Sequence, residues 1–175
     1  MIGGKSERMG RPKSLLPSEN GALSEKLFSL LGGVCDKAFL LGSGPLPPAL
    51  QGAERICDAT EFSGPLAGIV AAHRRAPFAD WLVLAVDLPN MDEKYLLKLV
   101  SLRAPGARFI GAHNVEKNSL EPLAAIYSPQ LLGALARFGE GELSINRMLG
   151  RLGIKGNPAL FDGIKLKNVN YPEDL

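Results

Sequence analysis

Short apolar runs alternate along the chain with segments whose leucines recur at helical spacing. The clearest run, Trp81–Val86, is apolar at every position. It predicts a buried strand that is covered on both faces, as strands of parallel sheets are. The segment 23–31 has leucines every three or four residues and is followed by Gly32–Gly33, so it predicts a helix with a glycine stop. Such alternation of strands and helices is typical of α/β domains.

The same pattern predicts further elements from end to end. Pro65 stands at a favourable first helical position, and Asp92–Glu93 supplies acidic residues to a first helical turn. The other predicted helices lie at 65–75, 92–102, 129–138 and 143–152, and the other predicted strands at 37–42, 55–57, 108–112, 122–127 and 165–166. We therefore expect a single domain over residues 1–175, with three αβα layers in a Rossmann-like arrangement and a mainly parallel sheet.

Composition narrows the class of protein. Of the 175 residues, 46% are hydrophobic and 22% are charged, which suits one ordinary globular core. The net charge of +2 is too small to indicate a nucleic-acid partner. Cys35 and Cys57 lack metal-type spacing, and no signal peptide or membrane-length apolar run is present. We therefore expect a cytoplasmic protein without a membrane partner.

The first 13 residues carry the strongest sign of a ligand. Glycine allows the backbone to approach a ligand closely, successive amides can converge on an anion, and cationic side chains form charge-assisted hydrogen bonds with phosphate oxygens. The spacing excludes a Walker A loop and a dinucleotide-binding fingerprint. The segment predicts a polyphosphate-binding loop, with a basic chain end containing a glycine turn as the alternative. Its glycines and basic residues are Gly3, Gly4, Lys5, Arg8, Gly10, Arg11 and Lys13.

Asp87 directly follows the clearest predicted strand and precedes Leu88–Pro89. Ligands of α/β sheets bind outside the carboxyl ends of the strands, and a carboxylate there suits Mg²⁺, which prefers oxygen ligands. The alternative is a loop aspartate that caps a turn before Pro89. Asp58 similarly ends the strand predicted at 55–57, and an ordinary turn is the alternative there.

Several segments resemble, in the right order, those of the molybdenum cofactor guanylyltransferases, which are nucleotidyltransferases with a glycosyltransferase-A-like fold. The first has the pattern Gly-Gly-x-Ser-x-Arg-Met-Gly-x-x-Lys, and the segments with Gly-Pro-Leu-Ala-Gly and Asn-x-Asn-x-Pro-Glu-Asp are the most discriminating. The resemblance runs from end to end and implies a fold of the nucleotide-diphospho-sugar transferase type. The matching segments are Gly3–Lys13, Gly64–Ile69, Asp87–Pro89, Glu121–Leu123 with Ala125 and Tyr127, and Asn168–Leu175.

The resemblance implies a Mg²⁺-dependent transfer of GMP from GTP to the terminal phosphate of molybdopterin, with release of pyrophosphate. Fixed cations would stabilise the charge that builds on the transferred group and on pyrophosphate. Molybdoenzymes or cofactor-delivery proteins are the implied protein partners. The implied catalytic residues are Arg8, Lys13 and Asp87, the implied substrate-binding residues are Ile2, Gly3, Gly4, Lys13, Asp58 and Asp87, and the implied metal ligands are Asp87 and Asn170.

The sequence departs from the family in two places. Only Met1 and Ile2 stand where the family has a buried strand, so we expect a shortened first strand, and Ile2 replaces a small alanine. Arg11–Lys13 looks more like the cytidylyl branch of the family. A cytidylyltransferase that acts on molybdopterin and a non-catalytic nucleotide-binding homologue therefore stay open, and a turn before Pro172 is the alternative role of Asn170.

Overall fold

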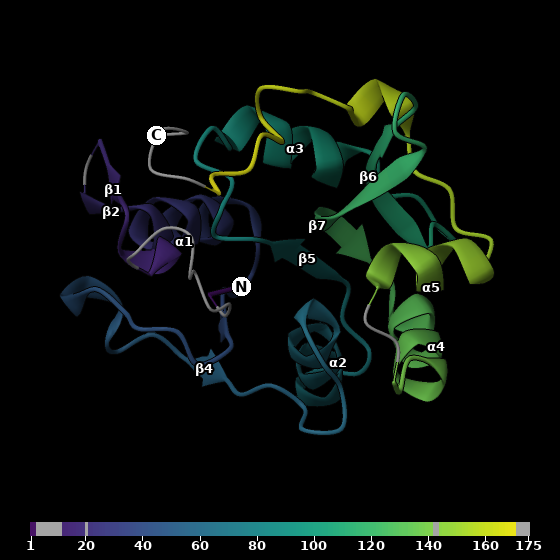
Figure 1. Cartoon of the computed structure of the whole chain (residues 1–175), viewed down its shortest axis with the longest axis horizontal. Helices are drawn as coiled ribbons and strands as arrows, with labels where there is room; N and C mark the ends of the chain where they lie inside the picture. The colour runs from purple at the N-terminus through teal and green to yellow at the C-terminus, as the bar shows by residue number, and fades with distance from the viewer. Residues whose placement is uncertain (3–11, 20, 142–143, 171–175) are drawn as a thin grey trace.

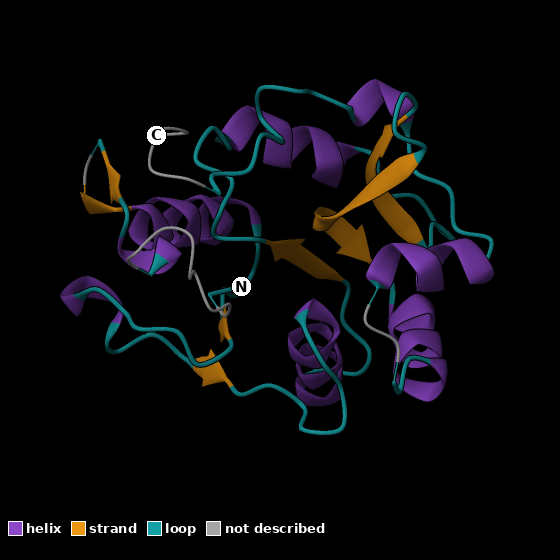
Figure 2. Cartoon of the chain, viewed as in Figure 1, coloured by secondary structure: helices purple, strands orange, loops and turns teal. Residues whose placement is uncertain are grey.

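The computed structural model describes residues 1–2, 12–19, 21–141 and 144–170, which form an α/β fold (Figures 1 and 2). Each of the predicted helices is present, but the first one continues through Gly32–Gly33, where a stop was predicted, and ends at Val34. The helices are α1 (Leu23–Val34), α2 (Pro65–Arg75), α3 (Glu93–Ser101), α4 (Pro129–Phe138) and α5 (Ile145–Arg151). The strands are β1 (Pro17–Ser18), β2 (Gly21–Ala22), β3 (Leu40–Leu41), β4 (Arg55–Ile56), β5 (Trp81–Leu84), β6 (Phe109–Asn114) and β7 (Ser119–Tyr127), with short 3₁₀ turns η2 (Lys13–Leu15), η3 (Pro48–Leu50) and η4 (Pro158–Leu160).

The helices begin where the sequence supplies capping groups. Asp92 accepts a hydrogen bond from the amide of Tyr95 at the start of α3, and Ser128 accepts one from the amide of Leu131 at the start of α4. Each cap satisfies an amide that has no partner within the first turn of its helix. Pro65 opens α2 at a position where its missing N–H costs nothing.

The described strands form three small sheets, and a mainly parallel sheet is not confirmed. The largest has the order β5-β7-β6, and both of its pairings are antiparallel. β3 and β4 form a parallel pair, and β1 and β2 form an antiparallel pair. The difference arises because β7 returns between β5 and β6, so the strand at 81–84 has an antiparallel neighbour rather than the parallel one that its apolar run indicated.

Met1 and Ile2 lie between β3 and β5 and connect the two sheets. The Ile2 amide donates to the Leu41 carbonyl at 2.9 Å, and the Val86 amide donates to the Met1 carbonyl at 3.1 Å. The nitrogen of Met1 donates to the Leu84 carbonyl at 2.6 Å. Two residues therefore stand at the position expected for the first strand.

Helices cover both faces of the β5-β7-β6 sheet (Figure 1). Leu84 and Ile126 belong to a core that includes residues of α1 and α3, whereas Val83 and Tyr127 belong to a second core that includes residues of α2, α4 and α5. Successive strand residues point to opposite faces, so each strand contributes to both cores. Full burial of one large aliphatic or aromatic side chain stabilises the fold by about 1.5–3 kcal/mol.

The strand predicted at 165–166 is wrong, because this segment forms turns. The carboxylate of Asp162 accepts hydrogen bonds from the amides of Ile164 and Lys165, both at 3.0 Å. The backbone carbonyl of Asp162 accepts a further one from the amide of Leu166. These local bonds replace those of a sheet. Among the described residues, no helix has both the length and the apolar character needed to cross a membrane.

Candidate functional site

Three polar side chains meet beyond the carboxyl end of β5. The ammonium nitrogen of Lys13 donates to Asp87 Oδ2 at 2.9 Å and to Asn170 Oδ1 at 3.0 Å. The side chains of Lys13 and Asp87 are 18% and 22% exposed, so both stay partly accessible to a ligand. We refer to these residues as the Lys13 cluster. In Figure 1 the arrow of β5 points toward α1, and α1 contacts η2, which begins at Lys13.

Hydrogen bonds to backbone carbonyls hold the three segments of the cluster in place. Ser14 is buried and donates to the carbonyl of Pro45, and Ser24 of α1 donates to the carbonyl of Ser14, both at 2.7 Å. The Val169 amide donates to the Asp87 carbonyl at 2.9 Å. These contacts fix Lys13 and the residues on either side of Val169 relative to β5, so the side chains that meet here are preorganised.

The cluster has the chemistry of a site for a hard cation. Asp87 and Asn170 each direct an oxygen at one ammonium group, so two oxygen ligands already converge on a cationic position. Mg²⁺ takes oxygen ligands and usually completes its shell with water and substrate phosphate. Within the described ranges, no group of three or more histidine, cysteine, aspartate or glutamate side chains could hold a metal alone. The residues present therefore fit Mg²⁺ that is shared with a phosphate ligand.

Asp58 lies against α2 and close to residue 1. A Cβ atom added at Gly68 would come within 3.1 Å of both Asp58 Oδ1 and Met1 Cε, so the glycine leaves room for the carboxylate. Partial burial raises the pKa of Asp58, and the amino group of Met1 partly opposes this. Burial lowers the pKa of that amino group, and the charges of Asp87 and Asp58 both oppose it. Both carboxylates therefore lie within electrostatic reach of residue 1.

The structure places the other residues implied by the sequence differently. Ile2 is 6% exposed and packs in the core with residues of α1 and β3. Its carbonyl is so close to Gly44 that a Cβ there would lie 2.0 Å from it. Gly3, Gly4 and Arg8 lie outside the described residues, and their roles stay predictions.

A cavity of about 520 Å³ adjoins the Lys13 cluster and shares Asn170 with it. Sequence reasoning gave no role to Glu121, the carboxylate of this cavity. Burial raises the pKa of Glu121, and the charge of Asp87 raises it further against a hydrogen bond from the Leu123 amide. The signal that could have revealed it is a charged residue within the otherwise apolar run 120–127. The cavity is lined by Asn114, Lys117, Ser119, Leu120, Glu121, Pro122, Asn146, Phe161, Gly163, Leu166, Lys167, Asn168 and Asn170.

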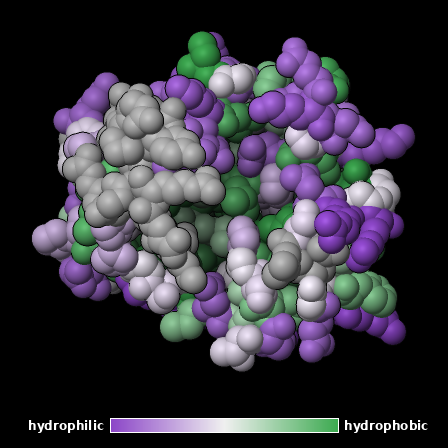
Figure 3. Space-filling view, viewed as in Figure 1, coloured by the Kyte–Doolittle hydropathy of each residue, from purple (hydrophilic) through white to green (hydrophobic). Residues whose placement is uncertain are grey.

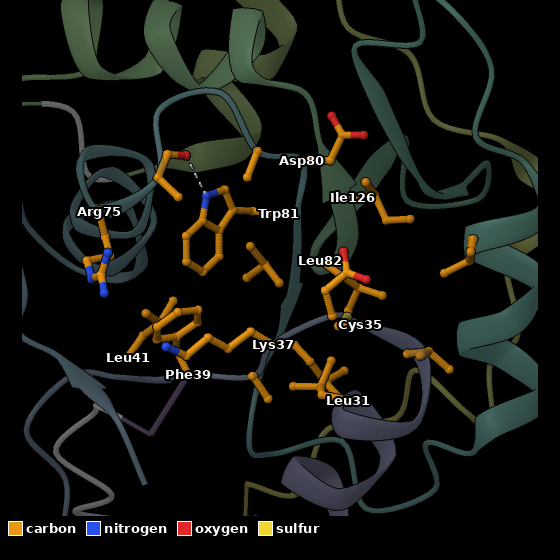
Figure 4. Close-up of a pocket in the computed structure, with 18 of the residues that line it drawn as sticks. Leu31, Cys35, Lys37, Phe39, Leu41, Arg75, Asp80, Trp81, Leu82 and Ile126 are labelled. Atoms are coloured by element: carbon orange, nitrogen blue, oxygen red, sulfur yellow. Dashed lines mark hydrogen bonds between the residues drawn. The ribbon is translucent and has the colours of Figure 1, made fainter.

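A larger cavity, of about 690 Å³, lies along β5 and is lined by all four of its residues (Figure 4). The rings of Phe39 and Trp81 are 5.4 Å apart there, and Trp81 Nε1 donates to the Ala76 carbonyl at 3.3 Å. Trp81 is the first residue of β5, whereas Asp87 follows its last residue. None of the three residues of the Lys13 cluster lines this cavity, so its size does not make it the reaction site.

The face of the molecule seen in Figure 1 is hollowed near its centre, over β5, and hydrophobic residues form the floor of this hollow (Figure 3). Hydrophilic residues lie to the right of the hollow in the same view (Figure 3). A ligand with an apolar or planar part and an anionic part fits such a surface better than a uniformly charged polymer does.

Comparisons with known proteins agree with this geometry. Residues 1–155 match the family described as the MobA-like NTP transferase domain. A probable molybdenum cofactor guanylyltransferase from Rhodopirellula baltica is 30% identical over 190 residues, which cover 100% of this chain and 87% of that protein. A molybdenum cofactor biosynthesis bifunctional protein from Synechocystis is 28% identical over 99% of this chain, which spans about half, 51%, of that protein's length.

Two solved structures share the fold. Molybdopterin-guanine dinucleotide biosynthesis protein A from Archaeoglobus fulgidus has a TM-score of 0.68 and 23% identity, over 99% of this chain and 91% of that one. The 2-C-methyl-D-erythritol 4-phosphate cytidylyltransferase from Thermus thermophilus has a TM-score of 0.66 and 14% identity, over 95% of this chain and 91% of that one. At these identities the likeness concerns the fold alone.

Proposed function

Because this chain belongs to the MobA-like NTP transferase family, a family of nucleotidyltransferases, we propose that it transfers GMP from GTP to the terminal phosphate of molybdopterin. Its curated relatives include molybdenum cofactor guanylyltransferases, which confirms the resemblance seen in the sequence. The observation that carries the proposal is the Lys13 cluster, where a cation and two oxygen ligands meet beyond the carboxyl end of β5.

In the proposed reaction, a terminal phosphate oxygen of molybdopterin forms a bond with the α-phosphorus of GTP. The bond from that phosphorus to the oxygen that bridges to the β-phosphate breaks, and pyrophosphate leaves with the electron pair. The acceptor oxygen is already anionic at neutral pH, so the step requires no general base. The site must chiefly orient two anionic groups and stabilise negative charge.

Lys13 would supply this stabilisation directly. Its ammonium is held between Asp87 and Asn170, within reach of any phosphate bound at the same edge. Nucleotide phosphates would compete with Asp87 for the ammonium, since charge-assisted hydrogen bonds to phosphate are strong. Arg8, Gly3 and Gly4 are proposed to contact the same phosphates.

Asp87 and Asn170 are proposed to hold Mg²⁺ through their side-chain oxygens. The bound ion would neutralise charge on the nucleotide phosphates and on departing pyrophosphate. The Asp87 backbone carbonyl accepts a hydrogen bond from the amide of Val169, which precedes Asn170. This bond keeps the Asp87 and Asn170 side chains close enough to share one ion.

Asp58 is proposed to bind the ribose or the base, beside residue 1 and α2. Gly64 has a positive φ of 60° just before α2, a conformation that glycine adopts without strain. With Gly68 beside Asp58, the start of α2 leaves space for a ring. The segment 64–68 and the asparagines at 168 and 170 favour the guanylyl branch over the cytidylyl branch.

Thermal unfolding with GTP, CTP, ATP and UTP, each with and without Mg²⁺, tests the proposal. A ligand at 100 times its Kd stabilises the folded state by about 2.7 kcal/mol, so selective binding is readily measured. GTP with Mg²⁺ should stabilise most, and adding molybdopterin should release pyrophosphate. Stronger stabilisation by CTP would favour a cytidylyltransferase, and selective GTP binding without pyrophosphate release would favour a non-catalytic nucleotide-binding protein.

A further inference from the structure

The 520 Å³ cavity next to the Lys13 cluster combines three kinds of side chain. Lys117 and Lys167 are basic, Phe161 offers an aromatic ring, and Glu121 contributes the carboxylate among the lining residues. A planar ring could pack on Phe161 while an anionic group interacts with the lysines. The cavity therefore suits a phosphorylated heterocycle better than a simple anion.

Glu121 occupies a costly position for a charged group. It lies on β7, is half-buried, and accepts the amide of Leu123 at 3.3 Å. A buried carboxylate that accepts few hydrogen bonds is unfavourable, and its partial desolvation would strengthen a bond to a ligand donor. The nearby hydroxyl of Tyr95 is buried and has no hydrogen-bond partner among the described residues. Burial raises the pKa of this hydroxyl, and the charges of Glu121 and Asp162 raise it further.

We propose that Glu121 selects the acceptor by accepting hydrogen bonds from the pyrimidine edge of a pterin seated in this cavity. This inference rests on the proposed function. The edge of a 2-amino-4-oxopteridine presents a ring N–H and an amino group side by side, and a carboxylate can accept both at once. Glu121 is thus a specificity-determining residue rather than part of the transfer site.

The position of Asn170 explains how such a ligand would reach the reaction. Asn170 lines the cavity and also accepts a hydrogen bond from Lys13 at 3.0 Å. A pterin that places its ring edge at Glu121 can therefore extend its phosphate-bearing side chain past Asn170 toward the Lys13 cluster. The acceptor phosphate and the nucleotide phosphates would meet at the residue that both sites share.

Guanine carries the same pair of donors as a pterin, so two ligands could present this edge to Glu121. Asp58, which is proposed to bind the nucleoside, lies against α2 and does not line this cavity, so the cavity is assigned to the pterin. Both sources can be tested separately. A pterin differs from the corresponding lumazine, and GTP differs from ITP, in having a 2-amino group.

The test uses two ligands: a pterin with a phosphorylated side chain and the lumazine with the same side chain. The affinity of each ligand is measured for the wild-type protein and for Glu121→Gln. Wild type should prefer the pterin by about tenfold or more, since a site that binds a donor by hydrogen bonds rejects the analogue that lacks it. Glu121→Gln should reduce this preference to about threefold or less. Glu116→Gln, an exposed glutamate before β7, is the matched control and should keep the wild-type preference.

Equal wild-type affinity for pterin and lumazine would overturn the inference without reference to any variant. An unchanged preference for pterin over lumazine in a folded Glu121→Gln protein would overturn it too. Loss of the preference for GTP over ITP in that variant would also overturn it, because Glu121 would then bind the nucleotide. Failure of wild type to bind GTP selectively contradicts the proposed function instead. The two failures are therefore distinguishable.

Discussion

Lys13 and Asp87 are 74 residues apart in the sequence, yet their side chains form an ion pair with 2.9 Å between Nζ and Oδ2. One partner has the charge needed to bind phosphate, and the other has the oxygens needed to bind a divalent cation. A partly exposed pair of this kind contributes only about 0–1 kcal/mol to stability. Changes at either residue should therefore affect ligand binding and turnover much more than folding.

Asp87→Asn should lower turnover about 100-fold or more, in line with the loss of one preorganised electrostatic group. The amide keeps the shape of the side chain but removes the charge that would hold Mg²⁺. Pyrophosphate release across a range of Mg²⁺ concentrations measures the effect, and removal of Mg²⁺ with a chelator should abolish wild-type activity.

The control for this variant is Asp36→Asn, which changes an exposed aspartate after α1 and should retain activity. Melting temperatures of both variants should stay close to that of wild type. Near-normal turnover by folded Asp87→Asn would contradict the metal assignment.

Lys13→Ala should weaken GTP binding and slow transfer while changing the free energy of unfolding without ligand by about 0–1 kcal/mol. The matched control is Lys94→Ala, an exposed lysine on α3. The GTP affinities of both variants are compared by titration at fixed Mg²⁺ and fixed salt, because salt screens the effect of exposed charges on affinity. Equal losses of affinity would mean diffuse charge attraction rather than an ordered phosphate site.

Gly68→Ala should weaken nucleotide binding more than it weakens the fold. Alanine is favoured over glycine inside a helix by about 1 kcal/mol, but the added Cβ would lie 3.1 Å from Asp58 Oδ1, so the carboxylate must move. Gly32→Ala on α1, where a Cβ meets nothing within 4 Å, should show the helix gain alone. Wild-type GTP affinity in Gly68→Ala, measured by calorimetry, would argue against a binding role for Asp58.

Glu121→Gln should change the pH dependence of stability. The ordinary pKa of this carboxyl is 4.5, and burial, followed by the charge of Asp87, raises it in the folded protein. Between these two values the folded state binds more protons than the unfolded state, so stability falls as pH rises through that window. Glutamine does not titrate, and the variant should therefore gain stability relative to wild type as pH rises.

Urea unfolding of wild type and of Glu121→Gln from about pH 4 to about pH 8 measures this difference. The difference should grow above pH 4.5 and then become constant. Parallel stability curves for the two proteins would show that Glu121 titrates normally. If Glu121→Gln gains stability and loses pterin selectivity, the wild-type protein keeps a destabilising carboxylate because that carboxylate is needed for binding.

The local elements could be predicted because their causes are local. The leucine spacing in 23–31, the cap at Asp92 and the proline at 65 each favour a helix through contacts within a few residues. The same holds for the apolar run at 81–86, whose first four residues form β5 and which contributes to the cores on both faces. The position of Asp87 beyond that strand followed from the same reasoning.

The direction of pairing could not be predicted from these signals. An apolar run indicates burial, but both the parallel and the antiparallel partner satisfy it. β7 pairs with β5 residues that lie about 40 positions earlier, from Trp81 with Tyr127 to Leu84 with Ala124. The choice of this neighbour depends on how the helices pack on both faces. At 165–166 a single carboxylate, that of Asp162, outweighed the strand pattern.

The sequence by itself determined the types of element, the α/β class and the residues with suitable chemistry, because spacing, caps and side-chain charge are properties of short segments. Only the tertiary structure decided that Lys13, Asp87 and Asn170 meet, since the first and last are 157 residues apart. It also decided that Glu121 faces a cavity beside them. Contacts of this kind depend on the packing of whole layers, which no local pattern encodes.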